Sequence, residues 1–141
     1  MIRELDPRDD AALARCFEVF SVLRPHLDLA AFATGVRAQT AEGYRVHYVE
    51  QDGAVAAAAG WRVARFLAWG RVVYIDDLVA HPERRRAWHG GALLDFLFAR
   101  ARELGCDAVH LDSGYQRNDA HRLYLNKGFV LSSHHFAARL C

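Results

Sequence analysis

The stretch YIDDLVAHPERRRAWHGGALLDFLFARAREL, residues 74–104, decides the fold. It begins as an apolar strand that carries two acidic residues and continues through a basic loop to Gly90-Gly91. It ends in a helix whose apolar residues recur at helical spacing and which Gly105 closes. A helix N-terminus presents unpaired amide N–H groups, and arginines just before it add charge-assisted contacts to phosphates. The segment therefore predicts an anion site where the loop enters the helix.

The residues before this stretch predict two helices and a strand pair. Asp6 reads as a helix N-cap with Pro7 at the first helical position, and an apolar stripe follows as far as Leu23. Asp52-Gly53 is a strong hairpin turn signal, so we interpret the alanine-rich run after it as a strand. The elements expected here are a strand over 2–5, helices from Asp6 to Leu23 and over 29–39, and strands over 44–50, 54–66 and 72–79.

The residues after 104 predict a strand, a short helix and two closing strands. The strand covers 108–112, and Asn118 or Asp119 caps a helix that contains Tyr124 and ends before Gly128. The closing strands are expected over 129–131 and 134–140. The full order is β-α-α-β-β-β-α-β-α-β-β.

Composition indicates one ordinary globular domain, because 141 residues with 52% apolar and 25% charged side chains suffice for a single core. The net charge of +1 gives no attraction to nucleic acid or to an anionic membrane surface. The three cysteines form no Cys-x-x-Cys pair, so neither a disulfide framework nor a zinc site is expected. The N-terminus has no apolar signal core and no stretch approaches the ~20 apolar residues of a membrane span, so we expect a cytoplasmic protein.

Two motifs in this order resemble those of the GNAT family of N-acetyltransferases. They are Val79-x-x-Pro82-x-x-Arg85-Arg86-Ala87-Trp88-His89-Gly90-x-x-Leu93-Leu94 and Ala120-x-x-Leu123-Tyr124-x-x-x-Gly128-Phe129. The resemblance implies an α/β (α+β) fold with a central mixed, mostly antiparallel twisted sheet and helices on both faces. It also implies a single acetyltransferase domain over residues 1–141.

The resemblance implies acetyl-CoA as cosubstrate and no metal. In the family, amides of a loop Gln/Arg-x-x-Gly-x-Gly/Ala bind the pyrophosphate of CoA; here Arg85 and Gly90 fill the outer positions, and Trp88 replaces the middle glycine. Glycine there lets the backbone approach a phosphate and adopt positive φ. The strand over 77–80 would pair its backbone with the pantetheine arm. The expected cofactor-binding residues are Leu78, Val79, Ala80, Arg85, Arg86, Ala87, Trp88, His89, Gly90 and Gly91.

Acetyl transfer needs a group that takes a proton from the amine and one that protonates the leaving thiolate. Tyr124 matches the family's tyrosine acid. Asp76, in a Tyr-Ile-Asp-Asp run similar to the Tyr-[Ile/Leu]-Glu-Asp of polyamine-type members, is the expected base, by way of a water. Strand alternation predicts that Asp77 points to the opposite face. Asp77 and Asp112 are candidates for binding a cationic acceptor.

The expected function is therefore transfer of an acetyl group to a primary amine by direct attack. The acceptor stays open between a small cationic amine and a peptide or protein amine, with no nucleic acid or membrane partner. Family members often dimerise, so a homodimer is one outcome for the oligomeric state. One alternative is a non-catalytic acyl-CoA-binding or regulatory module with Trp88 in place of the loop glycine. Another is an α/β domain that binds a different phosphate ligand through Arg84–Arg86.

Overall fold

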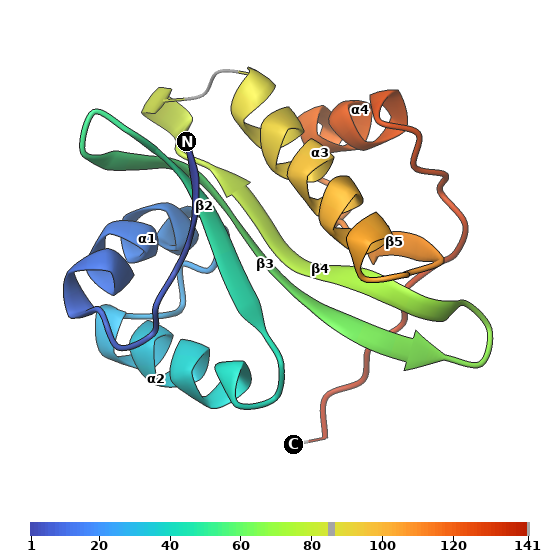
Figure 1. Ribbon diagram of the computed structural model, residues 1–141, viewed down its shortest axis with the longest axis horizontal. Coiled ribbons are helices and arrows are strands. Elements are labelled where there is room, and N and C mark those ends of the chain that lie inside the picture. Colours follow the sequence, from blue (N-terminus) through green and yellow to red (C-terminus); the bar gives the residue numbers. More distant parts are fainter. Residues whose placement is uncertain (85–86, 141) are drawn as a thin grey trace. The chain divides into compact units, whose positions relative to one another are not determined.

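The computed structural model describes residues 1–84 and 87–140, and the chain divides into two compact units, Met1–Leu111 and Asp112–Cys141. The first unit holds a five-stranded sheet in which strands that follow one another in sequence are neighbours (Figure 1). The expectation of a single domain stays a prediction. The elements are β1 (Ile2–Glu4), α1 (Asp10–Leu23), α2 (Leu29–Thr40), β2 (Arg45–Gln51), β3 (Ala54–Phe66), β4 (Gly70–Ala80), a 3-10 turn (Pro82–Arg84), α3 (Ala87–Glu103), β5 (Ala108–Leu111) and, in the second unit, α4 (Asn118–Asn126).

The sheet is mixed and mostly antiparallel, as the resemblance implied. Strands β1 to β4 pair antiparallel with their neighbours, and β5 runs parallel to β4. Asp52 and Gly53 both have positive φ, 53° and 77°, which is the backbone of a type I′ hairpin turn between β2 and β3. The α/β fold class is confirmed in these respects.

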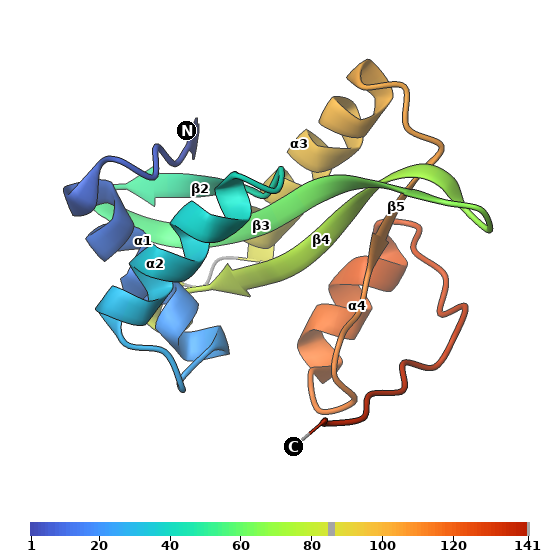
Figure 2. The ribbon, with the colours of Figure 1, turned by 90° about the horizontal axis from the view of Figure 1, so that it is seen from below.

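Helices cover both faces of this sheet (Figure 2). Val46 and Tyr48 of β2 lie in a buried cluster with the apolar faces of α1 and α2. The residue between them, His47, points the other way and packs its ring 4.7 Å from that of Phe96 on α3. Alternation along β2 thus separates two apolar layers, one on each face.

The alanine-rich start of β3 is wholly enclosed between these layers. Ala56, Ala57, Ala58 and Ala59 are all 0% exposed. Alanine favours helices by intrinsic propensity, but the turn before the run and the burial of both faces decide for a strand here. Small side chains in the central strand also let the helices on either face approach the sheet closely.

Two predicted helix caps were wrong. Asp9 caps α1, because its side chain accepts a hydrogen bond from Ala12 N at 3.1 Å. Asp6 instead accepts from Arg8 N at 2.9 Å, so its carboxylate closes a turn two residues on and cannot cap the helix. The N-cap of α4 is Arg117, not Asn118 or Asp119 as predicted, and the Arg117 side chain makes no capping hydrogen bond.

The two closing strands were also wrong. In the second unit, residues 129–140 form no strand, so the order among the described residues ends with α4. A strand requires ladder hydrogen bonds to a neighbour, and an apolar triplet such as 129–131 does not supply them by propensity alone. Two histidines of this segment contact residues of the same unit: His134 Nδ1 lies 3.0 Å from the hydroxyl of Tyr115, and His135 Nδ1 lies 3.6 Å from Asp112.

None of the helices within the described ranges combines the length and the apolar character needed to cross a membrane.

Candidate active site

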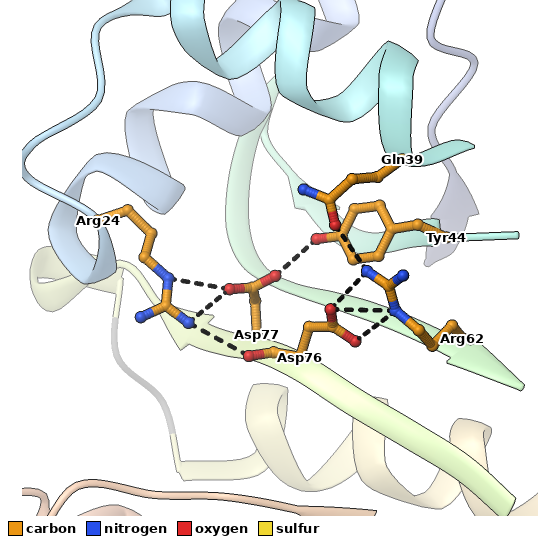
Figure 3. Close-up of polar contacts among 6 residues, drawn as sticks. All are labelled: Arg24, Gln39, Tyr44, Arg62, Asp76 and Asp77. Atoms are coloured by element: carbon orange, nitrogen blue, oxygen red, sulfur yellow. Dashed lines mark hydrogen bonds and ion pairs between the residues drawn. The ribbon is translucent and has the colours of Figure 1, made fainter. Parts of the chain in front are cut away.

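A β-bulge in β4 turns two neighbouring carboxylates to the same side. Gly60 pairs with Asp77, but the next pair along joins Trp61 to Ile75, so Asp76 is an extra residue without a partner position on β3. Alternation predicted that the two aspartates would face opposite ways. That prediction was wrong, because the extra residue interrupts the alternation. Figure 3 shows both carboxylates in one polar network.

Asp77 is held from two directions. Nε and Nη2 of Arg24, at the end of α1, donate to Asp77 Oδ1 at 3.0 and 2.8 Å. The hydroxyl of Tyr44 donates to Oδ2 at 2.7 Å. The Asp77 side chain is only 14% exposed, so its charge depends on these partners. Arg24 Nη2 also lies 3.3 Å from the backbone oxygen of Asp76, which ties the end of α1 to the bulge.

Asp76 forms a bidentate ion pair with Arg62 of β3. Nε of Arg62 donates to both carboxylate oxygens at 3.1 Å, and Nη2 donates to Oδ2 at 2.6 Å. Gln39 of α2 accepts from the same Nη2 at 2.6 Å, which orients the guanidinium. The hydrogen bond to Asp76 raises the pKa of Arg62 above its ordinary value, so this group stays charged. Bidentate arginine–carboxylate pairs of this kind are among the stronger hydrogen bonds in proteins.

Gly60 makes room for the hydroxyl of Tyr44. A Cβ at this position would collide with the tyrosine hydroxyl and ring. Burial, with the nearby charge of Asp77 adding to it, raises the pKa of Tyr44 far above its ordinary range. The hydroxyl therefore stays protonated and remains a donor to Asp77. A glycine inside a strand often marks such a close approach, so Gly60 is the sequence signal that could have pointed to a buried partner here.

The network is balanced in charge. Two carboxylates face two guanidiniums, and each carboxylate is bonded to an arginine. The charge of Asp76 and Asp77 is therefore no argument for a cationic acceptor. Sequence reasoning missed four members of this network, because they come from the C-cap of α1, from α2, from the residue before β2 and from β3, and no local spacing links them: Arg24, Gln39, Tyr44 and Arg62.

The edge of β4 beside the bulge is open in the first unit. β5 pairs with β4 only from Val72 to Ile75, whereas β3 accompanies β4 as far as Ala80. His81 N donates to Ala56 O on β3 at 2.8 Å. Because successive residues of a strand direct their backbone groups to alternate sides, Leu78 and Ala80 direct theirs away from β3. Two backbone donors and two acceptors thus lie along this edge, which suits an extended chain of amides such as pantetheine.

The N-terminal turn of α3 follows β4 and contains the rest of the predicted anion site. Arg85 and Arg86 lie outside the described residues, and the helix begins at Ala87. Trp88 is 58% exposed and its ring lies 3.9 Å from that of His89. Asp52 is the single non-glycine residue with positive φ among those described, so Trp88 has an ordinary helical backbone. The position therefore does not demand glycine for its conformation.

The remaining predicted cofactor-binding residues of this segment are His89, Gly90 and Gly91. His89 is 1% exposed and its Nε2 lies 3.2 Å from Gln51 Oε1, so its ring points into the protein rather than toward a ligand. Gly90 and Gly91 are the fourth and fifth residues of α3, after the three residues Ala87–His89 whose backbone N–H groups have no partner within the helix. These amides, with the open edge of β4, are the groups that fit a CoA molecule.

Tyr124 and Asp112 belong to the second unit. Tyr124 lies on α4 and packs edge-on against Phe129, with ring centroids 5.8 Å apart. Burial raises the pKa of Tyr124 above its ordinary value. Asp112 pairs with His135 within the same unit.

Known proteins show similarity over nearly the whole chain. The model of the acetyltransferase (GNAT) family matches residues 11–129. An uncharacterized N-acetyltransferase, YhdJ of Bacillus subtilis, is 33% identical over 87% of this chain and 88% of its own. An aminoalkylphosphonate N-acetyltransferase of Salmonella typhimurium is 29% identical over 86% of this chain and 80% of its own. An aminoglycoside N-acetyltransferase solved with CoA superposes with a TM-score of 0.83 at 16% identity, over 100% of this chain and 95% of that chain.

The family match covers both motifs and the described elements from α1, apart from its first residue, to α4. The chain belongs to the acetyltransferase (GNAT) family.

Proposed function

We propose that this protein transfers an acetyl group from acetyl-CoA to a primary amine by direct attack. The observation that carries the proposal is the open edge of β4 directly beside the two carboxylates of the bulge. In the proposal this edge binds the amides of the cosubstrate, and the neighbouring carboxylates handle protons. The CoA complex of a fold neighbour and the N-acetyltransferase names of two relatives support it.

Cosubstrate binding is assigned to two backbone surfaces. Leu78 and Ala80 offer N–H and C=O groups along the β4 edge, with Val79 between them facing the core. The free amides at the start of α3, with Gly90 and Gly91 directly after them and with Arg85 and Arg86, are proposed to hold the pyrophosphate. Acetyl-CoA supplies the activated acetyl thioester when bound.

Proton transfer is assigned to Asp76 and Tyr124. Asp76 Oδ1 accepts one hydrogen bond from Arg62, which leaves a lone pair that can take a proton from the amine through a water. Arg62 and Gln39 fix the direction of that lone pair. Tyr124, whose raised pKa keeps it protonated at neutral pH, donates a proton to the departing sulfur. The amine nitrogen then bears the acetyl group, and CoA leaves as the thiol.

The test begins with calorimetric titration of the full chain with acetyl-CoA and with desulfo-CoA. Micromolar binding of both, followed by acetylation of at least one amine in a mixed panel, is expected. Tyr124→Phe should lower kcat by about 10²-fold or more while acetyl-CoA still binds. Absence of CoA binding would refute the proposal. Binding without turnover, unaffected by Tyr124→Phe, would instead favour the non-catalytic acyl-CoA-binding module.

A further inference from the structure

We propose that the acceptor carries an anionic group, a carboxylate or a phosphonate, beside its primary amine, and that Arg24 binds this group. The inference rests on the proposed function and concerns the substrate class of the same site. It follows from the way in which the four charged side chains of the bulge network share their hydrogen bonds (Figure 3).

The guanidinium of Arg24 has hydrogen-bond donors that no described residue uses. A guanidinium has five N–H donors, and the bonds of Arg24 to Asp77 and to the Asp76 backbone come from Nε and Nη2. Nη1 has no hydrogen-bond partner within the ranges that the structure describes. The side chain is 42% exposed, the largest fraction among the four charged members of the network. An outward-facing pair of donors is therefore available to a ligand.

Arg62 has no such freedom. Its Nε and Nη2 are taken by Asp76 and Gln39, and its guanidinium carbon lies 5.2 Å from the centre of the Tyr44 ring. Its side chain is 26% exposed. This arginine orients Asp76, whereas Arg24 both supports Asp77 and presents donors to solvent.

Both carboxylates are already paired with arginines. Asp77 Oδ1 accepts twice from Arg24 and Oδ2 accepts from Tyr44, while both oxygens of Asp76 are bonded to Arg62. The second ammonium of a diamine would therefore meet carboxylates whose charge an arginine already balances. An anionic group meets no such competition, because it can take the Nη1 edge of Arg24 by a charge-assisted bond.

The geometry also relates the anion to the reacting amine. Arg24 Nη2 lies 3.3 Å from the backbone oxygen of Asp76, the residue proposed as base. An anion bound to Nη1 of the same guanidinium therefore lies near the backbone of Asp76. The linker between the anionic group and the amine must then span the distance from Nη1 to the Asp76 carboxylate.

The experiment compares amines of similar size that differ in charge: 2-aminoethylphosphonate, β-alanine, propylamine and 1,3-diaminopropane. We expect the full chain to show a higher kcat/KM for the two anionic amines than for the other two. In Arg24→Gln the ratio of kcat/KM for 2-aminoethylphosphonate over propylamine should fall by about tenfold or more, as for loss of one charged hydrogen bond. The ratio cancels any general loss of activity from disturbing Asp77.

Arg37→Gln is the matched control. Arg37 is also about half exposed, at 48%, and bonded to an aspartate, Asp10, at 2.7 Å, but it lies outside the network. This variant should leave the ratio unchanged. Arg24→Lys, which keeps the charge, should recover part of the preference and covers the case in which Arg24→Gln folds poorly.

Calorimetric titration of 2-aminoethylphosphonate into the CoA-loaded protein gives a readout that does not need turnover. Binding that weakens in Arg24→Gln supports the inference. The inference is overturned if the diamine is the preferred acceptor, if the ratio is the same in Arg24→Gln as in the wild type, or if the phosphonate does not bind. Failure of acetyl-CoA itself to bind would instead count against the proposed function.

Discussion

The indole N–H of Trp61 donates to Nδ1 of His47 across 2.9 Å. Because Nδ1 accepts, the proton of the neutral ring sits on Nε2, which lies 3.6 Å from a carboxylate oxygen of Glu4. His47 is 3% exposed, and burial lowers its pKa from 6.5 to about 4. The nearby carboxylate of Glu4 works against this shift but does not offset it. The folded protein therefore prefers the neutral ring.

This preference predicts that stability falls on acidification. The folded pKa of His47 is below the unfolded one, so its contribution is complete above about pH 6.5 and is lost as the pH falls toward 4. Between pH 7 and pH 5 the free energy of unfolding should decrease by about 2 kcal/mol through this residue alone. Urea titrations at the two pH values measure it.

Two variants separate His47 from other groups that titrate in this range. His47→Gln stays neutral and should show a smaller decrease between the two pH values than the wild type. His26→Gln removes an exposed histidine and should keep the wild-type decrease. Equal decreases in the wild type and His47→Gln would contradict the prediction.

Gly60→Ala should destabilise the protein by about 1–3 kcal/mol, because the new methyl group meets the hydroxyl of Tyr44 and must displace it from Asp77. Gly35→Ala is the control. Gly35 lies inside α2 with nothing within 4 Å of an added Cβ, so helix propensity should raise stability by up to about 1 kcal/mol. Thermal unfolding of both variants gives opposite signs if the close approach of Tyr44 is the cause. A neutral Gly60→Ala would mean that the ring can shift without loss.

Several elements were predicted nearly to their ends. The helix predicted over 29–39, although its apolar pattern was the weaker one, spans Leu29–Thr40, and the predicted C-terminal glycine of α3, Gly105, has a φ of 69°. The hairpin turn and the alanine-rich strand were also correct, since a two-residue turn determines the register of the strands beside it. The closing strands failed because pairing, not propensity, makes a strand.

The site was predicted only as far as its residues are close in sequence. Asp76 and Asp77 were identified from one run of four residues, but their common orientation was not, because a bulge depends on the register with β3. Arg24 and Asp77 are 53 positions apart and meet only after folding. For the same reason the charge balance of the network, which decides what kind of acceptor fits, could not be read from composition.

Trp88→Gly should leave the affinity for acetyl-CoA within about threefold of the wild type. Trp88 has a helical backbone and an exposed side chain. Replacing it with glycine therefore releases no backbone strain and removes no buried side chain from the start of α3. Glycine in the first turn should instead lower stability by up to about 1 kcal/mol. Calorimetric titration of both proteins with acetyl-CoA measures the two affinities. A much higher affinity in Trp88→Gly would mean that the indole obstructs the cosubstrate.

Asp76→Asn should lower kcat/KM at pH 7 by about 10²-fold or more, since the amide cannot accept the proton of the attacking amine. Acetyl-CoA binding should be unchanged, because the cosubstrate is assigned to backbone groups from Leu78 onward. Asp10→Asn is the matched control, as Asp10 is an aspartate bonded to an arginine at 2.7 Å outside the network, and it should keep full activity. If Asp76→Asn retained wild-type turnover while Asp77→Asn lost it, the base would be Asp77, and Arg24 would act on the base rather than on the acceptor.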